Sequence, residues 1–325
     1  MRRRGVYLRV LFCIGAAFLG RGILSPAQAP QPQPQEPAII RVTSNLVMVP
    51  VSVTDQAGLA VKDLRAADFR IEEDGEAEAV ARMDEPGTTP LEMALLFDVS
   101  GSVHGRFEFE RQAASRFLRE VLKPKDAVTV FAIGRQPRRI QERTVNVQSA
   151  LQSLAALEAT KEATAFFDSL ATGIHALHNT APPGTRRVAV VVSDGEDNYS
   201  TEHDLDDTLR ELQHADCLFY SINPSGPSIR LNRVSLRGQK GLERLAAETG
   251  GAAFLPDRLE ELDAIFTRIT NELQAQYLLG YYSHNQKMDG GFRKIAVRVP
   301  ARPELRVRAR QGYYASRHPE SRASR

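Results

Sequence analysis

The sequence predicts an α/β protein: a mostly parallel sheet with helices on both faces, plus a small β-sandwich-like domain built by strands from both ends of the chain. Apolar runs alternate with helical patterns over residues 89–276, which is typical of a parallel sheet covered on both faces. Apolar and polar residues alternate with period two on either side, at 39–88 and 277–315. The 325 residues, 42% of them hydrophobic, suffice for about two domains.

The first 29 residues are typical of a secretory signal peptide. A basic start precedes an apolar run over 6–19, and Ala27-Gln28-Ala29 offers small residues for cleavage. We expect an exported mature chain, periplasmic or secreted, without a membrane span. An uncleaved anchor and a lipoprotein site at Cys13 are the alternatives. Residues 30–38, rich in Gln and Pro, predict an extended linker.

Charge and cysteine content exclude two further classes. The formal net charge is +2, but five arginines and no acids lie in residues 1–29, so the mature chain carries −3. A basic body that binds nucleic acid through counterion release is therefore absent, and we expect no nucleic-acid partner. Cleavage leaves Cys217 alone, which excludes an intrachain disulfide and favours a buried, inert thiol.

The elements can be assigned in order along the chain. Valines at every second position over 47–53 predict a strand, and Pro50 indicates an edge strand. A second short strand at 69–71 is followed by Asp74-Gly75, a dipeptide suited to a hairpin turn. Buried strands then follow at 93–97, 127–133, 188–192, 218–222 and 252–255, with helical stripes at 113–122, 205–212 and 259–273 and half-exposed strands at 295–299 and 305–309. Residues 316–325 are expected to form a disordered tail.

Three oxygen-bearing residues follow the first buried strand of the central region: Asp98, Ser100 and Ser102. The carboxyl edge of an open α/β sheet is where ligands collect, and a tight turn at Gly101 lets these side chains converge. Oxygen-only ligands select a hard divalent cation. A helix cap or a turn without a ligand are the simpler interpretations of the motif. An EF-hand is excluded because its twelfth position is Phe109, and no glycine-rich phosphate loop follows the strand.

A second apolar strand, 188–192, also ends in a carboxylate, Asp194. If the two strands are neighbours, Asp98 and Asp194 point at one site, where a cation relieves their repulsion. This pairing favours a metal over a catalytic dyad. Glu196 and Asp197 are interpreted as solvated loop charges, with tuning of cation affinity as the alternative.

At Asp98, Ser100 and Ser102 the chain resembles the von Willebrand factor A (VWFA) domain family, specifically exported bacterial VWFA-related proteins, over roughly residues 40–315. The resemblance implies a Rossmann-like sheet and a metal-ion-dependent adhesion site (MIDAS), which adds Thr164 and Asp194 as ligands. Glu162-Ala163 departs from the two glycines usual before the threonine, so Thr160 is the alternative ligand. The implied cation is Mg²⁺, or else Mn²⁺ or Ca²⁺, and the implied partner is a protein that presents Asp or Glu.

We therefore expect an exported adhesion or scaffold protein that binds its partner through the cation and catalyses no reaction. A cation-assisted hydrolase and a structural envelope module with a vestigial site are the alternatives. Since three or more strands are needed for a stable small sheet, the two period-two regions are expected to pair. The VWFA domain is then an insertion, and its two connections, near residues 89 and 277, should lie close together opposite the metal.

Overall fold

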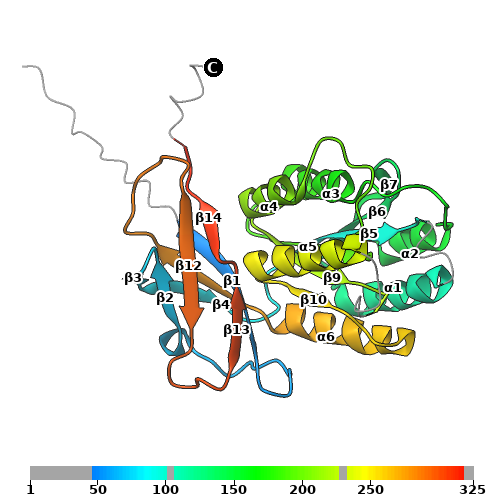
Figure 1. Ribbon diagram of the computed structural model, residues 1–325. Coiled ribbons are helices and arrows are strands. Elements are labelled where there is room, and N and C mark those ends of the chain that lie inside the picture. Colours follow the sequence, from blue (N-terminus) through cyan, green and yellow to red (C-terminus); the bar gives the residue numbers. More distant parts are fainter. Residues whose placement is uncertain (1–45, 101–105, 227–232, 318–325) are drawn as a thin grey trace, which may run out of the picture. The chain divides into compact units, whose positions relative to one another are not determined.

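The computed structural model describes residues 46–100, 106–226 and 233–317, all within one compact unit, Ser44–Arg325 (Figure 1). Four predicted features lie outside the described residues: the signal peptide at 1–29, the linker at 30–38, Ser102, and residues 318–325 of the tail.

The central sheet has six strands in the order β10-β9-β8-β5-β6-β7, and every neighbouring pair is parallel except β6 and β7. The predicted buried strands are confirmed. The edge strand β7 was not predicted, because its stretch RRIQERT is charged and carries no apolar run; it forms the half-exposed edge of the sheet. The strands are β5 Leu91–Asp98, β6 Ala127–Ile133, β7 Arg138–Thr144, β8 Arg186–Val192, β9 Cys217–Ile222 and β10 Ala252–Phe254.

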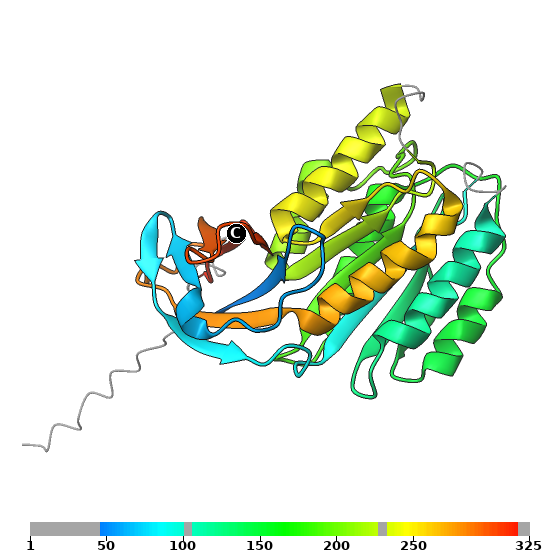
Figure 2. The ribbon, with the colours of Figure 1, turned by 90° about the horizontal axis from the view of Figure 1, so that it is seen from below.

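Helices cover both faces of this sheet, as predicted (Figures 1 and 2). On one face the core includes Met93, Leu95 and Phe97 of β5, with α1 Phe107–Val121, α2 Val147–Ala155 and α6 Leu262–Ala275. On the other face the core includes Ala94 and Leu96, with α3 Phe166–Thr180, α4 Leu205–His214 and α5 Arg233–Thr249. Within the described segments we find no helix with the length and hydropathy needed to span a bilayer.

Strands from the two ends of the chain pair with each other, which confirms that prediction. One antiparallel sheet has the order β13-β1-β11-β4 and the other β14-β12-β2-β3. Valines of β1, Ile71 of β2, Leu279 of β11 and Ile295 of β12 share one core, so the two sheets pack as a small sandwich. The strands are β1 Leu46–Thr54, β2 Arg70–Glu73, β3 Glu76–Glu78, β4 Val80–Asp84, β11 Tyr277–Tyr282, β12 Phe292–Arg298, β13 Arg306–Ala309 and β14 Gly312–Tyr314, with 3₁₀ turns at Ala66–Asp68 and Leu259–Glu261.

Two local predictions in this sandwich have different outcomes. The Asp74-Gly75 hairpin is confirmed: both residues have positive φ, 50° and 91°, and join β2 to β3. The prediction that Pro50 marks an edge strand is wrong, because β1 pairs with β11 on one side and β13 on the other. β13 reaches only residues 51–54 of β1, so Pro50 has a neighbouring strand on one side alone and is tolerated there.

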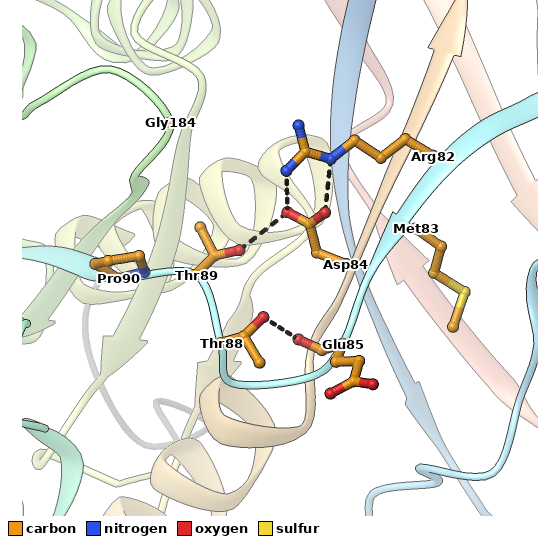
Figure 3. A pocket seen from close by; sticks show the side chains of 8 residues that line it. All are labelled: Arg82, Met83, Asp84, Glu85, Thr88, Thr89, Pro90 and Gly184. Carbon is orange, nitrogen blue, oxygen red and sulfur yellow. Dashed lines mark hydrogen bonds and ion pairs between the residues drawn. The ribbon is translucent and has the colours of Figure 1, made fainter.

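The two connections between sandwich and central sheet lie side by side, as expected. Arg186, the first residue of β8, donates to the carbonyl of Thr89 (3.2 and 3.3 Å) and to that of Leu273 (2.7 Å). Because β8 begins here, this junction lies at the opposite end of the sheet from Asp98. The first connection is further ordered by Asp84, which accepts hydrogen bonds from Arg82 (2.6 and 3.1 Å) and Thr89 (3.2 Å) beside an open hollow of about 500 Å³ (Figure 3).

Candidate metal centre

Asp98, the last residue of β5, is fully buried at the carboxyl edge of the sheet. Its Oδ1 accepts the backbone N–H of Ser100 at 2.9 Å, and its Oδ2 accepts the Ser193 hydroxyl at 2.6 Å. Ser193 follows β8, which pairs with β5 in parallel register, Phe97 opposite Val192. The two strands therefore end at the same level, and a hydroxyl bridges their loops.

Asp194 leaves β8 directly after that bridge and is 4% exposed. Its Oδ1 accepts the N–H of Glu196 at 3.0 Å, while the Ser193 hydroxyl accepts the N–H of Gly195 at 3.1 Å. Gly195 has φ +72°, and a Cβ there would meet Leu242 at 2.7 Å, so the turn requires glycine. The turn holds Asp194 at the same edge as Asp98, and the charge of Asp194 raises the pKa of Asp98.

Thr164 is buried in the loop that precedes α3 and is fixed by the Asp194 loop. Its N–H donates to Asn198 Oδ1 at 2.9 Å, and its carbonyl accepts the N–H groups of Asn198 and Tyr199 at 3.1 and 3.0 Å. Thr160, the alternative, donates its hydroxyl to the carbonyl of Val99 at 3.0 Å. The structure thus brings Asp98, Ser100, Asp194 and the Thr164 loop to one edge, while Ser102 lies outside the described residues.

Two buried acids at this edge have raised pKa values. Burial raises the pKa of Asp98 to about 6, against the lowering effect of its bonds from Ser193 and Ser100, and Asp194 raises it further. A second acid, Glu110 of α1, has no exposed surface; among the described residues it forms an ion pair with Arg106, and neither of its carboxylate oxygens has a hydrogen-bond partner. Glu110 was not predicted as a site residue, because its position within a helical stripe carries no signal of a site.

Four further residues contact the loops of the site, and their roles were not predicted. Asp197 is not a solvated charge: its Oδ1 accepts the N–H of Phe166 at 2.8 Å and the hydroxyl of Ser200 at 2.6 Å, which caps the first turn of α3. Glu196 contacts the Ser235 hydroxyl. Ser193 and Asn198 were overlooked, although a serine that ends an apolar strand beside a candidate ligand was an available signal.

The donor set fits a hard divalent cation. The groups gathered here are carboxylate and hydroxyl oxygens, which Mg²⁺, Mn²⁺ and Ca²⁺ accept. Within the described ranges, no three His, Cys, Asp or Glu side chains gather closely enough to bind one ion. A cation here would therefore depend on Ser and Thr hydroxyls and on water beside Asp98 and Asp194.

Comparisons with known proteins agree with this architecture. A family profile described as the von Willebrand factor type A domain matches residues 93–196, and no curated protein matches the chain. Among solved structures, the chain is similar to an aerotolerance-related membrane protein from Bacteroides fragilis NCTC 9343, with 18% identity over 56% of this chain and 98% of that one and a TM-score of 0.45.

Two other solved structures are similar as well. One is the vWF domain of the type V pili tip protein Mfa5 from Porphyromonas gingivalis, with 13% identity over 56% of this chain and 94% of that one and a TM-score of 0.45. The other is a von Willebrand factor type A protein from Catenulispora acidiphila, with 12% identity over 86% of this chain and 75% of that one and a TM-score of 0.47. The profile match runs from β5 to the turn that carries Asp194, which is the part of the sheet where the acidic edge forms. Residues 93–196 of the chain therefore match the von Willebrand factor type A domain family, and this stretch forms part of the central sheet.

Proposed function

We propose that this protein binds a partner protein through a divalent cation, most simply Mg²⁺, held by Asp98, Ser100, Ser102, Thr164 and Asp194. The observation that carries the proposal is the pair of buried carboxylates, Asp98 and Asp194, whose loops are joined by the Ser193 hydroxyl. A cation between them compensates their charge. Hydroxyl ligands leave it electrophilic, so that it accepts an Asp or Glu oxygen of the partner in an open position.

Thr164 is preferred to Thr160 as the threonine of the site. The Thr160 hydroxyl is engaged by the carbonyl of Val99, whereas the hydrogen bonds that fix Thr164 all involve its backbone. A side chain whose backbone is fixed by the Asp194 loop is positioned for a ligand without further ordering.

The surroundings of the site suit an acidic partner. A hollow of about 370 Å³ lies beside Val99 and Thr160; two exposed arginines, Arg135 and Arg138, and one acid, Glu162, line it. Arg135 donates to the Tyr199 hydroxyl at 2.6 Å and lies 4.6 Å over that ring, so it links the β6–β7 loop to the Asp194 loop. Two exposed guanidinium groups favour the approach of carboxylates.

The proposal does not require chemistry at the site. A hydrolase needs a general base beside the cation, and His175, His203 and His284 contact Glu211, Asp168 and Glu78, none of which is a proposed ligand. We further propose that the protein is exported through the signal peptide at 1–29 and acts in the periplasm or outside the cell as an adhesion or scaffold protein.

The test has two parts, with the mature chain as the reagent. Calorimetric titration with Mg²⁺, Mn²⁺ and Ca²⁺ should give one site in the wild type and none in Asp98→Asn. Capture from an envelope extract should then recover a partner in Mg²⁺ but not in EDTA. Thr164→Ala should weaken that partner more than it weakens the cation, because water can replace the hydroxyl.

Capture that persists in EDTA, with an intact fold by circular dichroism, would exclude the adhesion mechanism and favour contacts through the β-sandwich. Turnover of ester or peptide substrates by the cation-loaded protein would favour the hydrolase instead.

A further inference from the structure

Glu110 is a buried acid that forms one ion pair, with Arg106, and no hydrogen bond among the described residues. Its side chain has no exposed surface, and within the described part of the chain neither Oε1 nor Oε2 has a hydrogen-bond partner. The guanidinium of Arg106, one turn earlier, lies 3.8 Å away, beyond hydrogen-bond distance. Burial of a carboxylate without hydrogen bonds is costly, so either a proton or a further positive charge beside that of Arg106 would stabilise this group.

The surroundings of Glu110 place it at the same edge as the proposed metal site. Arg106 donates to the carbonyl of Pro224 and to the Ser225 hydroxyl, both at 2.9 Å, in the turn that follows β9. The ring of Phe107 packs on that of Phe97, next to Asp98, with centroids 5.5 Å apart. The start of α1, with Glu110 one turn after Arg106, therefore lies at the carboxyl edge of the sheet, where β5 and β9 end.

The electrostatics agree with this placement. Burial raises the pKa of Glu110 to about 8, Arg106 opposes the rise, and Asp98 and Asp194 both increase it. The charges of Asp98 and Asp194 therefore affect the protonation of Glu110. The three acids do not form a common set of direct ligands, since no group of three His, Cys, Asp or Glu in the described part of the chain is close enough to bind one ion.

We propose that Glu110 is an outer carboxylate of the metal centre, which accepts a hydrogen bond from water on the cation and raises cation affinity. The inference rests on the metal site of the proposed function. Mg²⁺ retains several waters in protein sites, and groups that accept from a metal's ligands affect affinity strongly. The two charges of the cation and the one of Arg106 balance Asp98, Asp194 and Glu110.

The competing account is that Glu110 is a neutral, protonated acid that only fills space, and Glu110→Gln separates the two. Gln keeps the shape of a protonated Glu and removes the charge. Glu108→Gln, on the same helix, is the matched control, because its side chain is 61% exposed and contacts only Arg111 and Gln112 among the described residues.

Both variants and the wild type are titrated with Mg²⁺ by calorimetry and melted in Mg²⁺ and in EDTA. We expect Glu110→Gln to bind Mg²⁺ about tenfold more weakly, to melt at the same or a higher temperature in EDTA, and to gain less from Mg²⁺. Glu108→Gln should behave as wild type. Glu110→Asp, which retains the charge, should bind Mg²⁺ more tightly than Glu110→Gln.

Equal Mg²⁺ affinity of wild type and Glu110→Gln would overturn the role of Glu110 and leave the metal centre in place. Equal weakening of Mg²⁺ binding in Glu110→Asp and Glu110→Gln would also overturn the role of Glu110, because packing and not charge would then be responsible. Absence of Mg²⁺ binding by the wild type would overturn the metal site itself, and the role of Glu110 with it.

Discussion

Asp98 illustrates how single residues shape this protein. Its carboxylate is buried and its hydrogen bonds come from neutral donors, the hydroxyl of Ser193 and the N–H of Ser100. Burial raises the pKa of Asp98 to about 6, and these neutral donors, which lower it, offset only part of that rise. The residue retains an unneutralised charge for a ligand, which a salt bridge to lysine or arginine would have removed.

The Ser193 hydroxyl should therefore affect cation binding without being a ligand. Ser193→Ala removes the 2.6 Å hydrogen bond to Asp98 and is expected to weaken Mg²⁺ binding about tenfold. Ser221→Ala is the matched control, since Ser221 is a buried serine of the adjacent β9 whose hydroxyl has no hydrogen-bond partner among the described residues. Calorimetric Mg²⁺ titration compares the two, and equal affinities would show that the bridge is only structural.

The raised pKa of Asp98 also predicts a pH dependence in the metal-free protein. A carboxyl whose folded pKa exceeds its unfolded one binds its proton more tightly when folded. Stability is therefore greatest below the usual value of 3.8 and falls as the pH rises through about 6, by roughly 3 kcal/mol. Glu110, raised to about 8, extends the loss to higher pH.

Urea unfolding in EDTA from pH 4 to 8 tests this against Asp98→Asn, which lacks the titrating group. The wild type should lose stability relative to the variant over pH 4–6, and Mg²⁺ should abolish the loss. A constant difference between the two proteins would contradict the assignment.

Among the elements, the loops that follow β8 and precede α3 act as one structure. Asn198 and Tyr199 bind both backbone groups of Thr164, and Asp197 caps α3. Asp168, on the first turn of α3, accepts the N–H groups of Thr201, Glu202 and His203 in return. The reciprocal bonds hold two candidate ligands, Asp194 and Thr164, in one rigid unit.

Asn198→Ala should therefore disturb the site from outside the ligand set. It leaves the buried N–H of Thr164 without its acceptor, at a cost of about 1–3 kcal/mol. We expect a several-fold loss of Mg²⁺ affinity together with a lower melting temperature. Glu202→Ala in the same loop removes only an exposed side chain and should change neither value. Unchanged Mg²⁺ affinity in Asn198→Ala would mean that Thr164 is positioned by other contacts.

At the scale of the whole molecule, buried polar contacts tie the sandwich to the central sheet. Arg308 of β13 forms an ion pair with Glu272 of α6, whose Oε1 also accepts the Tyr220 hydroxyl of β9 at 2.5 Å. Glu272 is 3% exposed, so its charge depends on these two partners. Gln276, beside Arg186, donates to the Ser52 hydroxyl of β1 at 3.1 Å.

Loss of Arg308 should destabilise both parts together. Arg308→Met leaves Glu272 buried without its cation, and we expect a loss of about 3–5 kcal/mol. The double variant Arg308→Met/Glu272→Gln should recover most of it, because the neutral amide can still accept from Tyr220. Arg302→Met, which removes an exposed pair with Asp63, should cost under about 1 kcal/mol. Calorimetric melting compares the four proteins, and no recovery in the double variant would show that Arg308 acts through packing.

Local patterns determined most of the fold. The apolar runs of β5, β6, β8 and β9 are buried on both faces, so each is recognisable without its neighbours. The hairpin turn at Asp74-Gly75 is likewise predictable from these two residues alone. Strand β7 was not predicted because its edge position leaves it charged. Pro50 led to the wrong prediction of an edge strand, because the position of a strand within a sheet depends on partners more than 200 residues away.

For the site, the sequence by itself determined which residues can provide oxygens at strand ends: Asp98, Ser100 and Asp194. Only the tertiary structure decided that β5 and β8 are neighbours, that Ser193 bridges their loops, and that Asn198 fixes Thr164 from another loop. Glu110 could not be predicted from the sequence, since an acid in a helical stripe is normally solvated. Only the folded structure shows that its carboxylate is enclosed and that Asp98 and Asp194 raise its pKa. Residue chemistry is local, whereas burial and the pairing of charges are properties of the folded chain.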